Sequence, residues 1–276
     1  KISNSIDTTW GNKSVVWVYG GKFTMHGGTV SGDNKYAGIH VTSEGTCGGT
    51  FVMKDGTITG NSGAGVTVSG GSTVIMDGGT ITGNVSGSNG GGVYVGYGTF
   101  TMNGGTISGN TSYSNGGGVY VNDASSKFIM NGGTISNNKT TIRPGYSKPS
   151  SGGGVYVGYG KFIMNDGTIE NNEAESFGGG IVVAKKGSFD MNGGTITDNK
   201  CTSLGSGVYL ESNGTFTMKG GSITKNRTKY YTYAGGVYVA EGSKLALSGT
   251  VNITENTRDY GGRNMAENVY LQGEAE

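Results

Sequence analysis

Residues 90–110, GGGVYVGYGTFTMNGGTISGN, decide the fold, because the chain repeats this stretch from one end to the other. The stretch contains three short β-prone segments, VYV, FTM and TIS, which are separated by breaks that contain glycine. The same pattern returns at residues 116–138, 152–172 and 178–199, and weaker copies lie on both sides. Repetition with a period of roughly 20–50 residues predicts an array in which each unit stacks on its neighbours.

Apolar and outward residues alternate within each copy, which is typical of strands with one buried face. The first segment supplies ten inward pairs: Val16/Val18, Ile39/Val41, Val66/Val68, Val93/Val95, Val119/Val121, Val155/Val157, Ile181/Val183, Val208/Leu210, Val237/Val239 and Val269/Leu271. The second segment places a methionine inside in eight copies and a leucine in the ninth: Met25, Met53, Met76, Met102, Met130, Met164, Met191, Met218 and Leu247. We interpret these rows as stacked core packing.

An asparagine follows the third segment in the successive copies. These residues are Asn61, Asn84, Asn110, Asn138, Asn172, Asn199, Asn226 and Asn256, and Asp33 holds the place in the first copy. Asparagine tolerates the left-handed backbone of tight turns. In stacked copies its amide can also bond the equivalent amide one coil above or below. The spacing therefore predicts an internal Asn ladder at one corner of the fold.

The repeat length selects the type of solenoid. Spacings of 23 to 34 residues between equivalent core positions are too long for hexapeptide helices and too variable for propeller blades. Three strands per coil predict an all-β, parallel β-helix. It should be right-handed, because connections between neighbouring parallel strands are almost always right-handed. Ten first strands give about nine to ten coils. We expect residues 1–276 to form one solenoid domain, a segment of a longer secreted protein.

The composition excludes several other classes of protein. Glycine supplies 58 of 276 residues but proline only 2, so the chain is not collagen-like. A net charge of +1 gives no electrostatic reason to expect nucleic acid or an anionic membrane as a partner. No apolar run is long enough to predict a membrane span. Cys47 and Cys201 lie five repeats apart, so we expect free thiols rather than a disulfide.

The repeat GGGVYV…GTFTMNGGTISGN resembles the β-helical repeats of large secreted or wall-attached surface proteins of Gram-positive gut-type bacteria. It is more distantly similar to the GG[AI][IV] and FxxN repeats of chlamydial polymorphic membrane proteins. The resemblance covers essentially the whole chain. It implies a pectate-lyase-like right-handed β-helix, a secreted or cell-surface location and an adhesin or stalk role. It carries over no catalytic residue, because such repeats define a scaffold.

A polysaccharide lyase or hydrolase on this fold would need carboxylates, with a basic residue or calcium, in one groove. The outward strand positions offer only Asp190 and Glu170, and residues 173–175 continue the acidic group into a loop. His26 and His40 lack a third ligand for a metal ion. We therefore predict no catalytic residue, no metal site and no cofactor, and a polysaccharide-active enzyme remains the first alternative.

The outer face of the first strands suggests a binding surface instead. It carries Tyr94, Tyr120 and Tyr156 in a row of rings about 4.8 Å apart. Rings so placed can stack on one another, cover a partner chain or present apolar faces to sugars. Inserted loops add aromatic and basic residues nearby: Arg143, Tyr146, Arg227, Tyr230, Tyr231 and Tyr233. These nine residues are the candidate ligand-binding set.

Rows of threonine on the third strands resemble the ice-contacting face of β-helical antifreeze proteins. The paired positions are Thr57/Thr59, Thr80/Thr82, Thr106/Ser108, Thr134/Ser136 and Thr195/Thr197. Glu170 interrupts the rows, and threonine is common on any exposed strand. Ice binding is therefore the second alternative.

Our leading hypothesis is a non-catalytic bacterial surface adhesin or stalk. We expect it to bind a glycan or a surface protein of a host or another bacterium through the aromatic row and the loops. We expect no nucleic acid partner and no membrane insertion, and self-association stays open.

Overall fold

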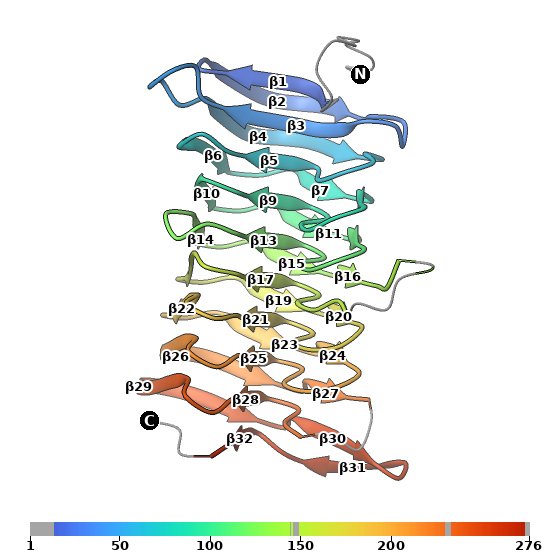
Figure 1. The fold of residues 1–276 in the computed structure, drawn as a ribbon, viewed down its shortest axis with the longest axis vertical. Coiled ribbons are helices and arrows are strands. Elements are labelled where there is room, and N and C mark those ends of the chain that lie inside the picture. Colours follow the sequence, from blue (N-terminus) through green and yellow to red (C-terminus); the bar gives the residue numbers. More distant parts are fainter. Residues whose placement is uncertain (1–13, 144, 146–148, 230–232, 274–276) are drawn as a thin grey trace.

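The computed structural model describes residues 14–143, 145, 149–229 and 233–273, and within them it contains 32 β-strands and no helix (Figure 1). The strands stack coil upon coil along one axis, so the described residues form a rod with β1 near one tip and β32 near the other. Three sheets run along the rod. None of the described elements is a helix that could cross a membrane.

Sheet 1 contains the first segment of each coil, and all of its strands are parallel. Its ten described strands are β1 (Ser14–Tyr19), β3 (Ala37–Thr42), β5 (Val66–Val68), β9 (Val93–Val95), β13 (Val119–Val121), β17 (Val155–Val157), β21 (Ile181–Val183), β25 (Val208–Leu210), β28 (Val237–Val239) and β32 (Val269–Leu271). Ten successive strands bound about nine turns, as the sequence predicts.

Sheet 2 contains both the second and the third segments. Its fourteen described strands are β2 (Lys22–Val30), β4 (Thr50–Thr59), β6 (Ser72–Met76), β7 (Thr80–Thr82), β10 (Gly98–Met102), β11 (Thr106–Ser108), β14 (Lys127–Met130), β15 (Thr134–Ser136), β18 (Lys161–Met164), β19 (Thr168–Glu170), β22 (Ser188–Met191), β23 (Thr195–Thr197), β26 (Thr215–Thr224) and β29 (Lys244–Thr254). The two segments share a sheet because β4 and β26, among others, run through the corner between them without a break.

Sheet 3 follows the asparagine corner, where the sequence analysis placed only loops. Its described strands are β8 (Val85–Ser86), β12 (Thr111–Ser112), β16 (Lys139–Thr140), β20 (Glu173–Ala174), β24 (Lys200–Cys201), β27 (Arg227–Thr228), β30 (Thr257–Tyr260) and β31 (Arg263–Ala266). Most of them have two residues, which is too short for a period-2 pattern to show. Only the last pair, β30 and β31, is antiparallel.

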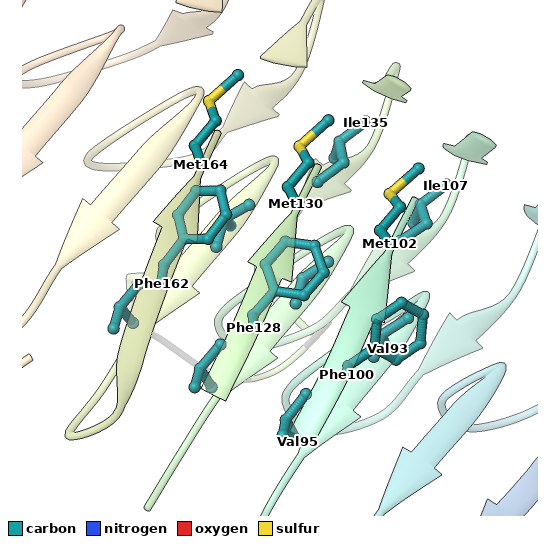
Figure 2. Packing of buried hydrophobic residues seen from close by; sticks show 14 of the residues in the cluster. Val93, Val95, Phe100, Met102, Ile107, Phe128, Met130, Ile135, Phe162 and Met164 are labelled. Atoms are coloured by element: carbon teal, nitrogen blue, oxygen red, sulfur yellow. The ribbon is translucent and has the colours of Figure 1, made fainter. Parts of the chain in front are cut away.

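The core consists of the predicted inward rows, except at the last coil, where Leu247, Val269 and Leu271 are exposed because no further described coil covers them. Phenylalanine and methionine of the second segment repeat in the same place in successive strands (Figure 2). The rings of Phe128 and Phe162 are 5.0 Å apart, and those of Phe162 and Phe189 are 4.8 Å apart. These side chains are fully buried, and each contributes about 1.5–3 kcal/mol to stability by leaving water.

The internal Asn ladder is confirmed, with a correction at each end. Asn61 to Asn256 are fully buried, and each Nδ2 atom donates to the Oδ1 atom of the next asparagine. Asp33 does not hold the first place: it is exposed with a φ of 49°, and the Gly32 amide donates to Asn61 instead. Asn268, which the sequence analysis missed, accepts from Asn256 and ends the ladder.

The glycine run that precedes each first strand lets neighbouring coils approach closely. A Cβ atom on Gly92 would lie 2.7 Å from the carbonyl oxygen of Gly118 in the next coil. Gly90 adopts a φ of 71°, a conformation that residues with a Cβ atom rarely take. The GGG signature is therefore a packing requirement of the scaffold.

Both cysteines are free, as predicted. Cys47 is exposed, whereas Cys201 lies inside sheet 3 and is buried. Burial raises the pKa of the Cys201 thiol to about 11, so this side chain is a core residue and not a nucleophile.

Candidate binding surface

The predicted aromatic row lies on the outer side of sheet 1, and its rings stack on one another. Register places Tyr94, Tyr120 and Tyr156 directly side by side on β9, β13 and β17. The ring centroids of Tyr94 and Tyr120 are 5.6 Å apart, and those of Tyr120 and Tyr156 are 5.3 Å apart, with interplanar angles below 15°. The row resumes lower down, where Tyr238 stacks on both Tyr209 and Tyr270.

Val182 interrupts the row, and a loop residue compensates for the missing ring. Phe177 comes from the connection that leads into the same coil, and it stacks on Tyr209 at 4.7 Å. Stacking of this kind covers the faces of the rings, so the row offers water mainly ring edges and hydroxyl groups.

Two hydroxyl groups of the row donate hydrogen bonds to neighbouring side chains. Tyr120 donates to Asn122 Oδ1 at 3.2 Å, and Tyr238 donates to Gln272 Oε1 at 2.7 Å. Burial, helped by the charge of Glu211, raises the pKa of Tyr209 to about 12. The pKa of Tyr156 is also raised, by the same two causes. Tyr156 and Tyr209 are therefore neutral at physiological pH.

A second group of aromatic residues lies at the C-terminal coil and shares Tyr270 with the row. Tyr233 stacks on Tyr270 at 4.4 Å, and the Arg258 guanidinium lies 5.5 Å from the Tyr233 ring and 5.6 Å from the Tyr260 ring. Arg258 also forms an ion pair with Glu267 at 3.1 Å. We call Tyr233, Arg258, Tyr260 and Tyr270 the Tyr–Arg cluster. Tyr233 and Tyr260 are 45% and 53% exposed, so this cluster presents more aromatic surface to water than the stacked row.

The structure does not bring the six described members of the predicted set together in one site. Tyr94, Tyr120 and Tyr156 form the upper part of the stacked row. Arg143 belongs to the connection after Asn138, about three coils before Arg227 and Tyr233, which corresponds to roughly 14 Å along the rod. Tyr146, Tyr230 and Tyr231 lie outside the described residues.

Ion pairs link neighbouring coils on the loop side. Arg227 bonds Asp259 at 3.1 Å, and Lys139 bonds Glu173 at 3.4 Å one coil below. Arg227 belongs to the predicted ligand-binding set, whereas Arg258 and Tyr260 do not. The repeat gives no signal for these two residues, because they belong to the irregular last coil.

The described residues contain no group of three or more His, Cys, Asp or Glu side chains that could hold a metal ion. The two outward acids singled out in the sequence are apart: Asp190 on β22 bonds Lys161 at 2.6 Å, and Glu170 lies on β19 between Ser136 and Thr197. The threonine rows of sheet 2 are in register, as in Thr106, Thr134 and Thr168.

A second, exposed amide ladder follows the corner between the two segments of sheet 2. Its members are the residues directly after the core methionines: Asp77, Asn103, Asn131, Asn165 and Asn192. Each Nδ2 atom donates to the preceding coil over 2.7–2.8 Å. Lys54 closes the N-terminal end with a 2.6 Å ion pair to Asp77. The sequence analysis does not predict this second ladder.

Comparison with known proteins bears on the fold. The family described as "Right handed beta helix region" matches residues 1–165, which is more than half of the 276-residue chain. The match confirms the right-handed coiling that was predicted from the usual connection between parallel strands. The chain has no match among curated proteins or solved structures.

Proposed function

The chain belongs to the right-handed β-helix region family, and we propose that it is a non-catalytic extracellular stalk or adhesin that binds a glycan or a surface protein. A fold alone does not define an activity, because one scaffold carries many functions. The proposal therefore depends on what this scaffold displays. The extracellular location is supported by the resemblance of its repeats to those of bacterial surface proteins.

The observation that carries the proposal is the contrast between a repeated interior and a non-repeated, exposed Tyr–Arg cluster. Exposed tyrosine rings beside a guanidinium group combine apolar faces with directed hydrogen-bond donors. Sugars and protein surfaces present the complementary mixture of apolar C–H faces and hydroxyl or carbonyl oxygens. Such aromatic and arginine residues are also enriched among the residues that dominate binding energy at interfaces.

The test compares two double variants. Tyr233→Ala with Tyr260→Ala removes the two most exposed rings of the cluster. Tyr97→Ala with Tyr159→Ala is the matched control, because these tyrosines are 52% and 55% exposed on the turns between sheets 1 and 2, away from the cluster. Thermal melting checks that both variants fold.

We expect the chain to bind members of a glycan array or intact cells. The cluster variant should bind at least about tenfold more weakly, which corresponds to about 1.4 kcal/mol, and the control should bind like the parent chain. Equal binding by all three proteins would remove the cluster from the proposal. Release of reducing ends or unsaturated sugars by the parent chain would replace it with an enzymatic function.

A further inference from the structure

The tyrosines of sheet 1 pair with one another in register, one coil apart. Tyr94, Tyr120 and Tyr156 are direct partners on β9, β13 and β17, which lie side by side in the middle of the rod (Figure 1). Tyr209 and Tyr238 are direct partners on β25 and β28. Neighbouring ring centroids in both groups are 5.3–5.6 Å apart, and the interplanar angles are 11–21°. The scaffold therefore holds pairs of phenol rings together at a separation that the strand spacing fixes.

Each of these pairs combines a ring that solvent reaches with one that it hardly reaches. Tyr120 and Tyr238 are 8% and 5% exposed, whereas Tyr94, Tyr156 and Tyr209 are half-buried. Burial is the main cause that raises the pKa of all five phenols, so each loses its proton only when its ring is oxidised. An oxidant in solution can take an electron from the accessible ring, and the buried ring lies against it.

We propose that the stacked tyrosines are a site of oxidative crosslinking, at which hydrogen peroxide and a haem peroxidase join neighbouring coils through dityrosine bonds. The inference does not depend on the proposed function. The expected bonds are Tyr94–Tyr120, Tyr120–Tyr156 and Tyr209–Tyr238. Each bond fastens two consecutive coils of the rod, and it constrains the unfolded chain in the way that a disulfide bond does.

Each bond consumes one molecule of hydrogen peroxide. The peroxidase removes one electron and one proton from a phenol and leaves a tyrosyl radical, whose unpaired electron is shared with the ring carbons ortho to the oxygen. Two such radicals form a carbon–carbon bond between ortho carbons. The hydrogen on each of these carbons leaves as a proton while each oxygen takes one up, which restores both phenols. The two electrons and two protons that the pair has lost convert hydrogen peroxide into two molecules of water.

Proximity favours this coupling within one molecule. Once the accessible ring is oxidised, electron transfer from the buried ring in contact with it moves the radical inward, and the accessible ring can be oxidised again. Two radicals then lie side by side, so coupling needs no encounter between molecules. Tyr19 and Tyr97 are 57% and 52% exposed, but Tyr19 has Thr42 as its register partner and Tyr97 lies in the turn after β9. Their oxidation depends on an encounter with another molecule to form a bond.

Val182 separates the two groups of tyrosines. It lies between Tyr156 and Tyr209 in the register. These two tyrosines are therefore two coils, or about 10 Å, apart. Phe177 stacks on Tyr209 but has no hydroxyl group from which a phenoxyl radical can form. The proposal therefore predicts bonds within each group and none between Tyr156 and Tyr209.

Treatment of the 276-residue chain with a haem peroxidase and hydrogen peroxide tests the proposal. We expect dityrosine fluorescence from a chain that still migrates as a monomer in denaturing electrophoresis. Trypsin cuts after Lys127, which separates Tyr120 from Tyr156, and it also cuts between Tyr209 and Tyr238. Tandem mass spectrometry should therefore find these two bonds as joined peptides that are lighter by two hydrogen atoms than the sum of their parts.

Phenylalanine variants assign the bonds, because they keep the stacked ring and remove only the hydroxyl group. Tyr120→Phe should lose both bonds of the upper group and keep Tyr209–Tyr238, whereas Tyr238→Phe should lose only the latter. Tyr19→Phe with Tyr97→Phe is the control that should crosslink like the parent chain, and thermal melting checks that every variant folds. The absence of dityrosine in the parent chain overturns the proposal. Bonds that mainly join separate molecules, or a yield that Tyr120→Phe leaves unchanged, also overturn it.

Discussion

Two asparagines of a single coil, Asn131 and Asn138, belong to ladders that differ in almost every physical respect. Asn138 is fully buried, and its side chain bonds Asn172 at 3.0 Å, the carbonyl of Ile107 at 2.9 Å and Asn110 at 3.0 Å. Asn131 is exposed and bonds only the side chains on either side of it. The inner ladder bonds both side-chain and backbone groups of the neighbouring coils, whereas the bonds given above for the outer ladder join side chains.

The comparison shows that two equally repeated rows of asparagine can contribute very differently to stability. The inner ladder satisfies backbone groups that water cannot reach, so each of its bonds is obligatory. The outer ladder replaces bonds to water that would be available anyway, and its net contribution should be small. The two ladders also run in opposite directions: inner amides donate toward the C-terminal coil and outer amides toward the N-terminal coil.

The largest difference in stability should separate two aspartate substitutions at adjacent residues, one in the core and one in the outer ladder. Met130 and Asn131 are adjacent, but Met130 is fully buried. Met130→Asp places an unpaired carboxylate in the core, which costs about 5 kcal/mol or more and should abolish folding at neutral pH. Asn131→Asp should fold with a modest loss of stability. Circular dichroism during thermal melting measures both, and a parental melting temperature for Met130→Asp would refute the inward assignment.

A smaller but still clear effect should separate the two ladders themselves. Asn138→Ala removes four buried hydrogen bonds: those from the amide and Nδ2 of Asn110 to Asn138 Oδ1, and those from Asn138 Nδ2 to the Ile107 carbonyl and to Asn172 Oδ1. At about 1 kcal/mol for each buried hydrogen bond, the free energy of unfolding should fall by about 4 kcal/mol. Asn131→Ala should cost only about 0.5 kcal/mol, because water replaces its partners. Urea unfolding measures both, and equal losses would show that burial does not separate the ladders.

The sequence reveals most of the scaffold because the interior repeats. Val93, Met102 and Asn110 recur at matching places in their neighbours, so strand, core row and inner ladder follow from spacing alone. Sheet 3 escapes the same reasoning, since its two-residue strands leave no alternation to detect. The prediction for Asp33 was wrong for a different reason. The backbone amide of Gly32 donates to Asn61, so the ladder needs no side chain at the first position.

The candidate site was much less predictable. Spacing places Tyr94, Tyr120 and Tyr156 in one row, but it does not tell whether rings stack on each other or face outward. The Tyr–Arg cluster depends on contacts between the connection at Tyr233 and the last coil at Arg258, which no period relates. The outer ladder was hidden because its position holds Lys54, Asp77 or asparagine in different coils.

The smallest predicted effect concerns the one titratable member of the outer ladder. Hydrogen bonds from Asn103 and then Lys54, together with the charge of Lys54, hold the pKa of Asp77 below its usual value. A lowered folded-state pKa means that this stabilisation is present above the unfolded pKa and is lost as pH falls through the folded one. Because the Asp77 side chain is partly exposed and its partners can be replaced by water, the contribution should stay below about 1 kcal/mol.

Nuclear magnetic resonance titration of the Asp77 carboxyl measures this pKa directly. Asn103→Ala should move it upward, because the variant removes the hydrogen bond that lowers it most. Asn131→Ala breaks the ladder one coil further on and should leave the Asp77 pKa almost unchanged, since the Asn103 bond remains. A comparable rise in both variants would instead mean that the outer ladder acts as a cooperative unit. The inner ladder has no acidic or basic member between Asn61 and Asn268, so its contribution should not change across the same acid range.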